Sequence, residues 1–256
     1  MSAPGSPAQA DGNRAPSGRR KLLLVVVGLI VLAGVIGGGY GLWYVLLGPT
    51  GPAAVSTGAP AIPTGAAVAP PVSFDGTWNV ETGLGSIADG SASFVGYRVQ
   101  EQLVGVGGHT AVGRTPKVTG SLALSGAVVS DVKITADLTA LVSDDSHRDD
   151  QLRRQAIETD NFPTATFTTT GSIDLGTLPA DGTAVSVSAT GTLTLHGVSK
   201  TVTVPLQVIR SGGIIAVTGT LPIVFSDYSI QKPNSFSVLS VDDHGTMELH
   251  LLFNHA

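Results

Sequence analysis

Charged side chains that could do chemistry gather in one short stretch of this sequence, residues 143–154, SDDSHRDDQLRR. Four aspartates surround one histidine there, which invites interpretation as a metal site. A calcium loop, however, needs a glycine at its sharp turn, and a tetrahedral zinc site needs several nitrogen or sulfur ligands. The stretch has no glycine and a single histidine. We therefore predict no metal site, and capping of a helix with solvated charge explains the cluster better.

The other candidates for catalysis are isolated from one another. The five remaining histidines show no HxH or HExxH spacing, and no GxSxG motif marks a serine nucleophile. The glycine-rich residues 105–108 lack the lysine of a phosphate-binding loop. With no cysteine, the chain has no disulfide, no thiolate chemistry and no acceptor for a lipoprotein anchor. We predict that the protein is not an enzyme and needs no cofactor.

One helix is expected to position this charged stretch. The segment Ser146–Ile157 can be capped by an aspartate or serine at residues 144–146, and Asp149 favours the positive end of the helix dipole. Arg153 and Arg154 lie toward the negative end. The helix has only a thin apolar stripe, so we expect it to lie over an opening or an edge of a larger β-structure.

Alternating apolar and polar side chains predict about eight β-strands after residue 74. The expected strands are 91–103, 117–125, 127–141, 164–174, 184–195, 200–210, 214–225 and 245–254. One apolar face per strand favours a closed antiparallel barrel or a sandwich. An eight-stranded barrel is just wide enough to hold a small ligand, although the apolar faces are equally compatible with a fully packed core.

The first 73 residues have a different composition. Residues 1–21 are predicted to be a disordered cytoplasmic tail, and the uncharged run 22–47 is long enough to be a transmembrane helix. Three basic residues, Arg19, Arg20 and Lys21, precede this run, so the N-terminus is expected in the cytoplasm and the remainder outside it. Residues 48–73 are rich in Pro, Gly and Ala and predict an extended tether. Signal cleavage near residues 51–54 is the alternative to an uncleaved anchor.

The distribution of charge and the lack of a catalytic motif limit the classes of molecule that the domain is expected to bind. The first 47 residues carry a net charge of +3 and the remainder −8, which excludes an electrostatic surface for nucleic acid on the domain of residues 74–256. Without a catalytic motif, an apolar channel would suit a long hydrophobic molecule, whose burial gains about 0.8 kcal/mol per CH₂ group.

Four stretches resemble the YceI-like family of extracytoplasmic polyisoprenoid-binding proteins. They are SFVGYRVQE at 93–101, HRDDQLR at 147–153 followed by NFPTATFT at 161–168, TGTLTLHGVSKTVTVPL at 190–206, and FSDYSI at 225–230. The resemblance implies a mostly β, lipocalin-like eight-stranded antiparallel barrel around an apolar channel, with one short helix. Glu101 stands where many members of the family have a histidine.

The resemblance and the alternation together imply a set of residues that line the channel. The expected lining residues are Val95, Tyr97, Ile134, Leu138, Phe167, Leu193, Leu195, Val204, Leu206, Phe225, Leu251 and Phe253. Arg148 or Tyr228 is expected near a polar head group. The implied function is binding of a polyisoprenoid, or a similar lipid such as a quinone, by a membrane-anchored domain. The alternative is a structural or sensory ectodomain that binds a protein partner without a lipid.

Overall fold

The computed structural model describes residues 51–55, 58–63, 65, 68–233 and 238–256. The predicted cytoplasmic tail of residues 1–21 and the predicted transmembrane helix of residues 22–47 lie outside these ranges. Within them, none of the helices combines the length and the apolar character that crossing a bilayer requires.

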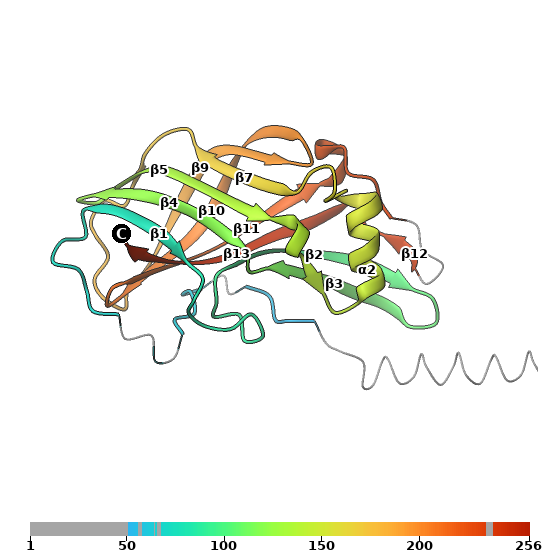
Figure 1. Ribbon diagram of the computed structural model, residues 1–256, viewed down its shortest axis with the longest axis horizontal. Helices are drawn as coiled ribbons and strands as arrows, with labels where there is room; N and C mark the ends of the chain where they lie inside the picture. The colour runs from blue at the N-terminus through green and yellow to red at the C-terminus, as the bar shows by residue number, and fades with distance from the viewer. Residues whose placement is uncertain (1–50, 56–57, 64, 66–67, 234–237) are drawn as a thin grey trace, which may run out of the picture. The chain divides into compact units, whose positions relative to one another are not determined.

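Eight antiparallel strands close into a barrel (Figure 1). In spatial order they are β1 (Gly76–Glu81), β4 (Val118–Ser125), β5 (Val128–Asp137), β7 (Thr164–Thr169), β9 (Ala184–Leu195), β10 (Val198–Ser211), β11 (Ile214–Val224) and β13 (His244–His255). Pairing of β13 with β1 closes the ring, with Trp78 opposite His255. Closure leaves no free edge in the ring, and the predicted eight-stranded antiparallel barrel is confirmed.

Further strands extend the barrel on one side. β2 (Phe94–Leu103) pairs with β13 along Thr246–His250, directly beyond the part of β13 that pairs with β1, and β3 (Gly107–Thr115) pairs with β2. Three short strands add to this arrangement: β6 (Val142–Ser143) on β3, β8 (Ile173–Asp174) on β5, and β12 (Val238–Val241) on β2. β1 and β2 thus occupy one strand position beside β13, divided in two by the interruption between them. β3 and β4 occupy the next position and are divided in the same way.

The sequence prediction missed β1, β3 and the short strands β6 and β12. In β3 the reason is its glycine content, since glycine is depleted in strands. Gly113 is required there because a Cβ atom at this position would lie 2.4 Å from Cε1 of Tyr97. The predicted strand 91–103 exists as β2, but it belongs to the extension, and β1 takes the corresponding place in the closed ring.

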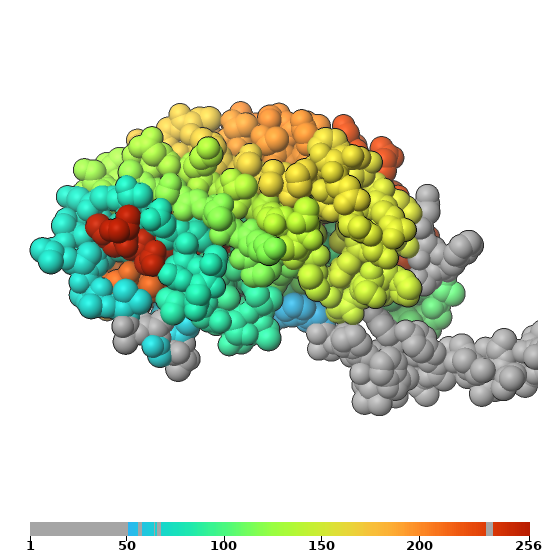
Figure 2. Space-filling model, viewed as in Figure 1, coloured from blue at the N-terminus to red at the C-terminus, as the bar shows by residue number. Residues whose placement is uncertain are grey.

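Helix α2 (Ser146–Gln151) covers one end of the barrel. The side chain of Asp145 accepts hydrogen bonds from the backbone N–H groups of His147, at 2.8 Å, and Arg148, at 3.4 Å. The predicted helix of 146–157 changes character half-way, because Leu152–Ala156 form a π-helical turn (η2). The atoms of this segment, yellow in Figure 2, cover the end of the barrel beside β2 and β3. We call this the helix end.

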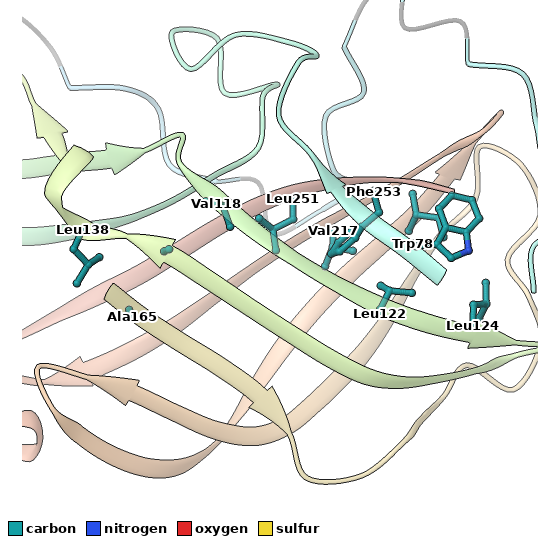
Figure 3. Close-up of a cluster of buried hydrophobic side chains, with 11 residues drawn as sticks. Trp78, Val118, Leu122, Leu124, Leu138, Ala165, Val217, Leu251 and Phe253 are labelled. Atoms are coloured by element: carbon teal, nitrogen blue, oxygen red, sulfur yellow. The ribbon is translucent and has the colours of Figure 1, made fainter. Parts of the chain in front are cut away.

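The opposite end is formed by the β10–β11 turn and the connection between β8 and β9, residues 175–183, and we call it the loop end. A buried apolar cluster reaches toward it along the inner faces of the strands. Trp78, Leu122 and Phe253 lie between the strands near this end, and Leu138 lies far from them (Figure 3). Leu138 begins a 3₁₀ turn, η1 (Leu138–Ala140), and a second such turn, η3 (Phe225–Tyr228), follows β11.

Part of the segment predicted as an extended tether lies on the outer surface of the barrel. The backbone N–H of Val55 donates to Glu248, and the carbonyl of Ala61 lies 2.9 Å from Nε2 of His250. Glu248 is 1% exposed and also pairs with Arg98 and Arg114, at 2.9 Å each. Because polar groups on the outward face of β13 are buried and need partners, this part of the segment is not available as a free spacer.

Candidate functional site

The barrel encloses a cavity of about 130 Å³. Side chains from the inner faces of the strands and from the β8–β9 connection line it, and all but Thr166 and Arg210 are apolar. The cavity has room for an apolar group. The described residues that line it include no assembly of acid, base and nucleophile. The arrangement suits the binding of an apolar group.

Eight of the twelve expected lining residues surround this cavity. They are Val95, Ile134, Phe167, Leu193, Val204, Leu206, Leu251 and Phe253. Each lies on a strand whose alternation directs every second side chain inward. Contact of these side chains with a ligand stays a prediction.

The other four expected lining residues lie outside the cavity, each for a local reason. Leu138 and Phe225 follow the last residues of β5 and β11 and begin turns, so strand alternation no longer orients them. Leu195 ends β9 at a hairpin and packs against the buried clusters near that turn. Tyr97 lies on β2 two residues beyond the lining residue Val95, where its hydroxyl approaches the charged residues of the helix end.

Alternation also identifies lining residues that the sequence analysis did not select. Val208 and Arg210 continue the inward series of Val204 and Leu206 on β10, and Val187 and Ala189 do the same on β9. The lining residues Leu175, Leu178 and Pro179 lie in a connection without periodicity. These three residues could be identified only from the folded structure.

A buried network of charged side chains occupies the helix end. Arg148 Nη2 donates to Glu101 Oε1 at 2.6 Å, and the same guanidinium pairs with Asp144. His109 Nδ1 lies 3.0 Å from the same Glu101 oxygen. Burial opposes the charged form of Arg148, but Glu101 and Asp144 outweigh this effect and raise the pKa of Arg148. The cation predicted near a head group is thus already neutralised by two carboxylates.

Tyr97 lies beside this network, two residues along β2 from the lining residue Val95. Its hydroxyl is buried and, within the described part of the chain, has no hydrogen-bond partner. Burial raises the pKa of Tyr97 well above its ordinary value of 10.0, although Arg148 opposes the shift. The phenol therefore stays protonated. One oxygen of Asp144 likewise has no hydrogen-bond partner among the described residues, although Nε2 of His109 lies 3.8 Å from it.

Tyr228, the second residue expected near a head group, lies in the packed core. It is 3% exposed, and its backbone carbonyl lies 3.0 Å from Nδ1 of His196. Glu158 approaches the other ring nitrogen of this histidine at 3.0 Å. These contacts connect the β9–β10 hairpin to η3. The residues of these two segments that resemble the family motif therefore stabilise the fold.

The loop end presents a different kind of cation. Arg210 is the one charged residue among those that line the cavity, and its Nε donates to the backbone carbonyl of Pro179 at 3.1 Å. Its guanidinium carbon lies 4.4 Å from the ring centroid of Phe74, which stacks on Trp78 at 5.7 Å. Both contacts are with neutral groups, and no carboxylate of the described residues forms an ion pair with this guanidinium.

A model of a known protein family matches most of the barrel domain. The model of the YceI-like domain matches residues 87–253, which is more than half of the chain. The chain belongs to this family. The chain is 31% identical over 132 residues to a UPF0312 protein of Vibrio vulnificus, covering 48% of this chain and 61% of that protein. A UPF0312 protein of Vibrio parahaemolyticus is 29% identical over 122 residues, with coverage of 45% and 61%. The chain thus spans about three fifths of the length of the curated relatives it matches.

A solved structure shares the fold of this YceI-like chain. A polyisoprenoid binding domain from Saccharophagus degradans, implicated in plant cell wall breakdown, aligns with a TM-score of 0.52 and 18% identity. The alignment covers 70% of this chain and 98% of that domain. At this identity the likeness establishes the barrel architecture.

Proposed function

We propose that this YceI-like barrel binds a long apolar lipid, of the polyisoprenoid or quinone class, in its internal cavity without converting it chemically. The apolar cavity is the observation that supports the proposal. A lining with only two polar residues favours hydrocarbon over any hydrophilic ligand, because burial of apolar surface is the dominant source of such affinity. Membership of the family and the polyisoprenoid binding domain of similar fold point to the same class.

The size of the cavity defines how such a lipid would fit. A volume of about 130 Å³ resembles the engineered cavities of roughly 150 Å³ that hold one benzene ring. A long chain would therefore occupy this space with one segment and displace lining side chains along the barrel. Met247, whose unbranched side chain is adaptable, is one of the lining residues that could make this adjustment.

The place of the domain in the cell forms a second part of the proposal. We infer that residues 22–47 anchor the chain in the membrane and that the barrel lies outside the cytoplasm. The uncharged run and the basic residues before it support this topology. A barrel held near a bilayer would be close to the membrane from which it draws its ligand.

The test is extraction and mass spectrometry of lipids that co-purify with the full chain from a lipid-containing host. A matched pair of variants provides the control: Ala189→Leu adds bulk inside the cavity, whereas Ala111→Leu adds the same bulk at a buried site that does not line it. We expect a stoichiometric lipid of isoprenoid mass with the wild type and with Ala111→Leu, and a loss of at least tenfold with Ala189→Leu.

Two results would overturn this function. One is a chain that remains free of lipid after purification and after addition of prenyl lipids and quinones, which would favour an ectodomain that binds a protein partner. The other is equal retention of lipid by both alanine variants, which would place the ligand outside the cavity.

A further inference from the structure

Arg210 stands at the loop end of the cavity as a cation among apolar side chains. Strand alternation along β10 directs it inward with Val204, Leu206 and Val208. A guanidinium has five N–H donors, and the contacts of Arg210 within the described ranges use one of them, on the carbonyl of Pro179. The remaining donors are available to a ligand at this end of the cavity.

The other arginines in the barrel domain all have carboxylate partners. Arg98 and Arg114 pair with Glu248, Arg148 pairs with Glu101 and Asp144, and Arg153 and Arg154 pair with Asp150. For Arg210, no carboxylate of the described residues lies within the 4.0 Å of an ion pair. An uncompensated arginine beside an apolar cavity is therefore a particular feature of the loop end.

The aspartates of the loop end are engaged elsewhere. Asp181 accepts from the backbone N–H of Gly212 at 2.8 Å, and Asp174 accepts from that of Gly176 at 2.8 Å. Asp75 accepts from the backbone N–H of Gly126 at 2.6 Å. Each carboxylate stabilises a turn, and none of the three lies within the 4.0 Å of an ion pair with Arg210.

We propose that the ligand is an amphipathic lipid with an anionic head group, a phosphate or a carboxylate, and that Arg210 binds this head at the loop end. The inference rests on the proposed lipid-binding function and adds the chemistry and the orientation of the ligand. Arginine presents a planar fork of donors that matches either anion in a bidentate manner. The apolar tail then extends from Arg210 toward Phe167 and Leu193, in the direction of the helix end.

The helix end does not suit an anion. There the single positive charge of Arg148 is shared between Glu101 and Asp144, and Asp149 adds a further carboxylate nearby. A phosphate placed among these groups would meet like charges, which disfavours its binding. The two ends thus select one orientation of an anionic lipid.

The test compares matched probes that differ only in the head group. Geranylgeranyl phosphate is measured against geranylgeraniol, and palmitate against palmityl alcohol, by equilibrium dialysis with the full chain in mild detergent. We expect the wild type to bind the anionic member of at least one pair about tenfold or more tightly, as a charged hydrogen bond provides. The pair with the larger preference identifies phosphate or carboxylate as the head.

Two substitutions assign this preference to Arg210. Arg210→Gln is expected to reduce the anion preference to about onefold while the alcohols bind within about twofold of the wild type, and Arg210→Lys is expected to retain part of it. Lys133→Gln, at an exposed site on β5, removes one positive charge away from the cavity and should leave the preference unchanged.

The outcomes separate this inference from the function on which it rests. If none of the four probes binds to the wild type, the proposed lipid-binding function itself fails. If alcohols and anions bind equally well to the wild type, the function stands and the anionic head is refuted. If Arg210→Gln weakens alcohols and anions by the same factor, Arg210 shapes the cavity and does not bind the head.

Discussion

At the helix end, Arg148 divides its charge between two buried carboxylates, whereas at the loop end Arg210 contacts a backbone carbonyl and an aromatic ring. The first arrangement satisfies charge within the protein. The second leaves a cation beside an apolar cavity that the protein itself does not fill. The difference indicates that the charged residues of the helix end stabilise the fold, whereas Arg210 at the loop end remains available to bind a ligand.

The largest expected effect tests the structural role of the helix end. Arg148→Met would leave Glu101 and Asp144 buried with His109 as their remaining neighbour, and we expect the free energy of unfolding to fall by about 3–5 kcal/mol. Chemical unfolding of the full chain in mild detergent measures this loss. Arg153→Met is the matched control, because its exposed pair with Asp150 is worth less than about 1 kcal/mol. A loss below about 1 kcal/mol for Arg148→Met would show that the network does not stabilise the fold.

A pair of alanine variants tests whether the filled and hollow parts of the molecule differ. Ala111 lies in β3 beside the helix end and is fully packed, so Ala111→Leu should cost about 1–3 kcal/mol. Ala189 lines the cavity, and Ala189→Leu should cost less because the added methyl groups enter free space. Thermal unfolding of both variants measures the difference. Equal losses would contradict an open cavity.

Removal of the loop-end cation should be tolerated better than removal of Arg148. Arg210→Gln loses one hydrogen bond to Pro179 and a cation–π contact with Phe74, which together are worth about 1–2 kcal/mol. No buried carboxylate is left without a partner. Chemical unfolding under the conditions used for Arg148→Met gives the comparison, and a loss as large as that of Arg148→Met would make the two ends equivalent.

The smallest effect concerns the unpaired hydroxyl of Tyr97. Tyr97→Phe removes a buried polar atom without a partner, so we expect the free energy of unfolding to rise by about 1 kcal/mol at neutral pH. The pKa of Tyr97 is raised in the folded chain, so the unfolded chain loses its proton first as the pH rises above 10.0. Wild-type stability should therefore decline above that pH, and Tyr97→Phe should decline less.

The control for this prediction is Tyr228→Phe. Burial also raises the pKa of Tyr228, so its removal should flatten the alkaline decline too, but its hydroxyl is not among the buried atoms without a partner. We expect no gain of stability at neutral pH from this variant. Destabilisation by Tyr97→Phe would indicate that the hydroxyl has a partner at the helix end, such as a ligand head group.

The sequence by itself determined about eight antiparallel strands with one apolar face each, because period-two alternation is a local property that each strand carries independently of its neighbours. Alternation left a barrel and a sandwich open, and the family resemblance implied the barrel. The sequence placed Ile134, Leu193, Val204 and Leu251 on inward faces because of the same alternation. It also placed a helix after Asp145, since capping depends on a few adjacent residues.

Only the tertiary structure decided which of the candidate groups were already paired. The local sequence around Arg148 and Arg210 does not show which of the two arginines has a carboxylate partner. Glu101, which neutralises Arg148, is 47 residues away in the chain, and Phe74, which contacts Arg210, is far from β10. Charge compensation depends on distances between segments that are remote in sequence. Only the folded barrel therefore shows which cation is available to a ligand.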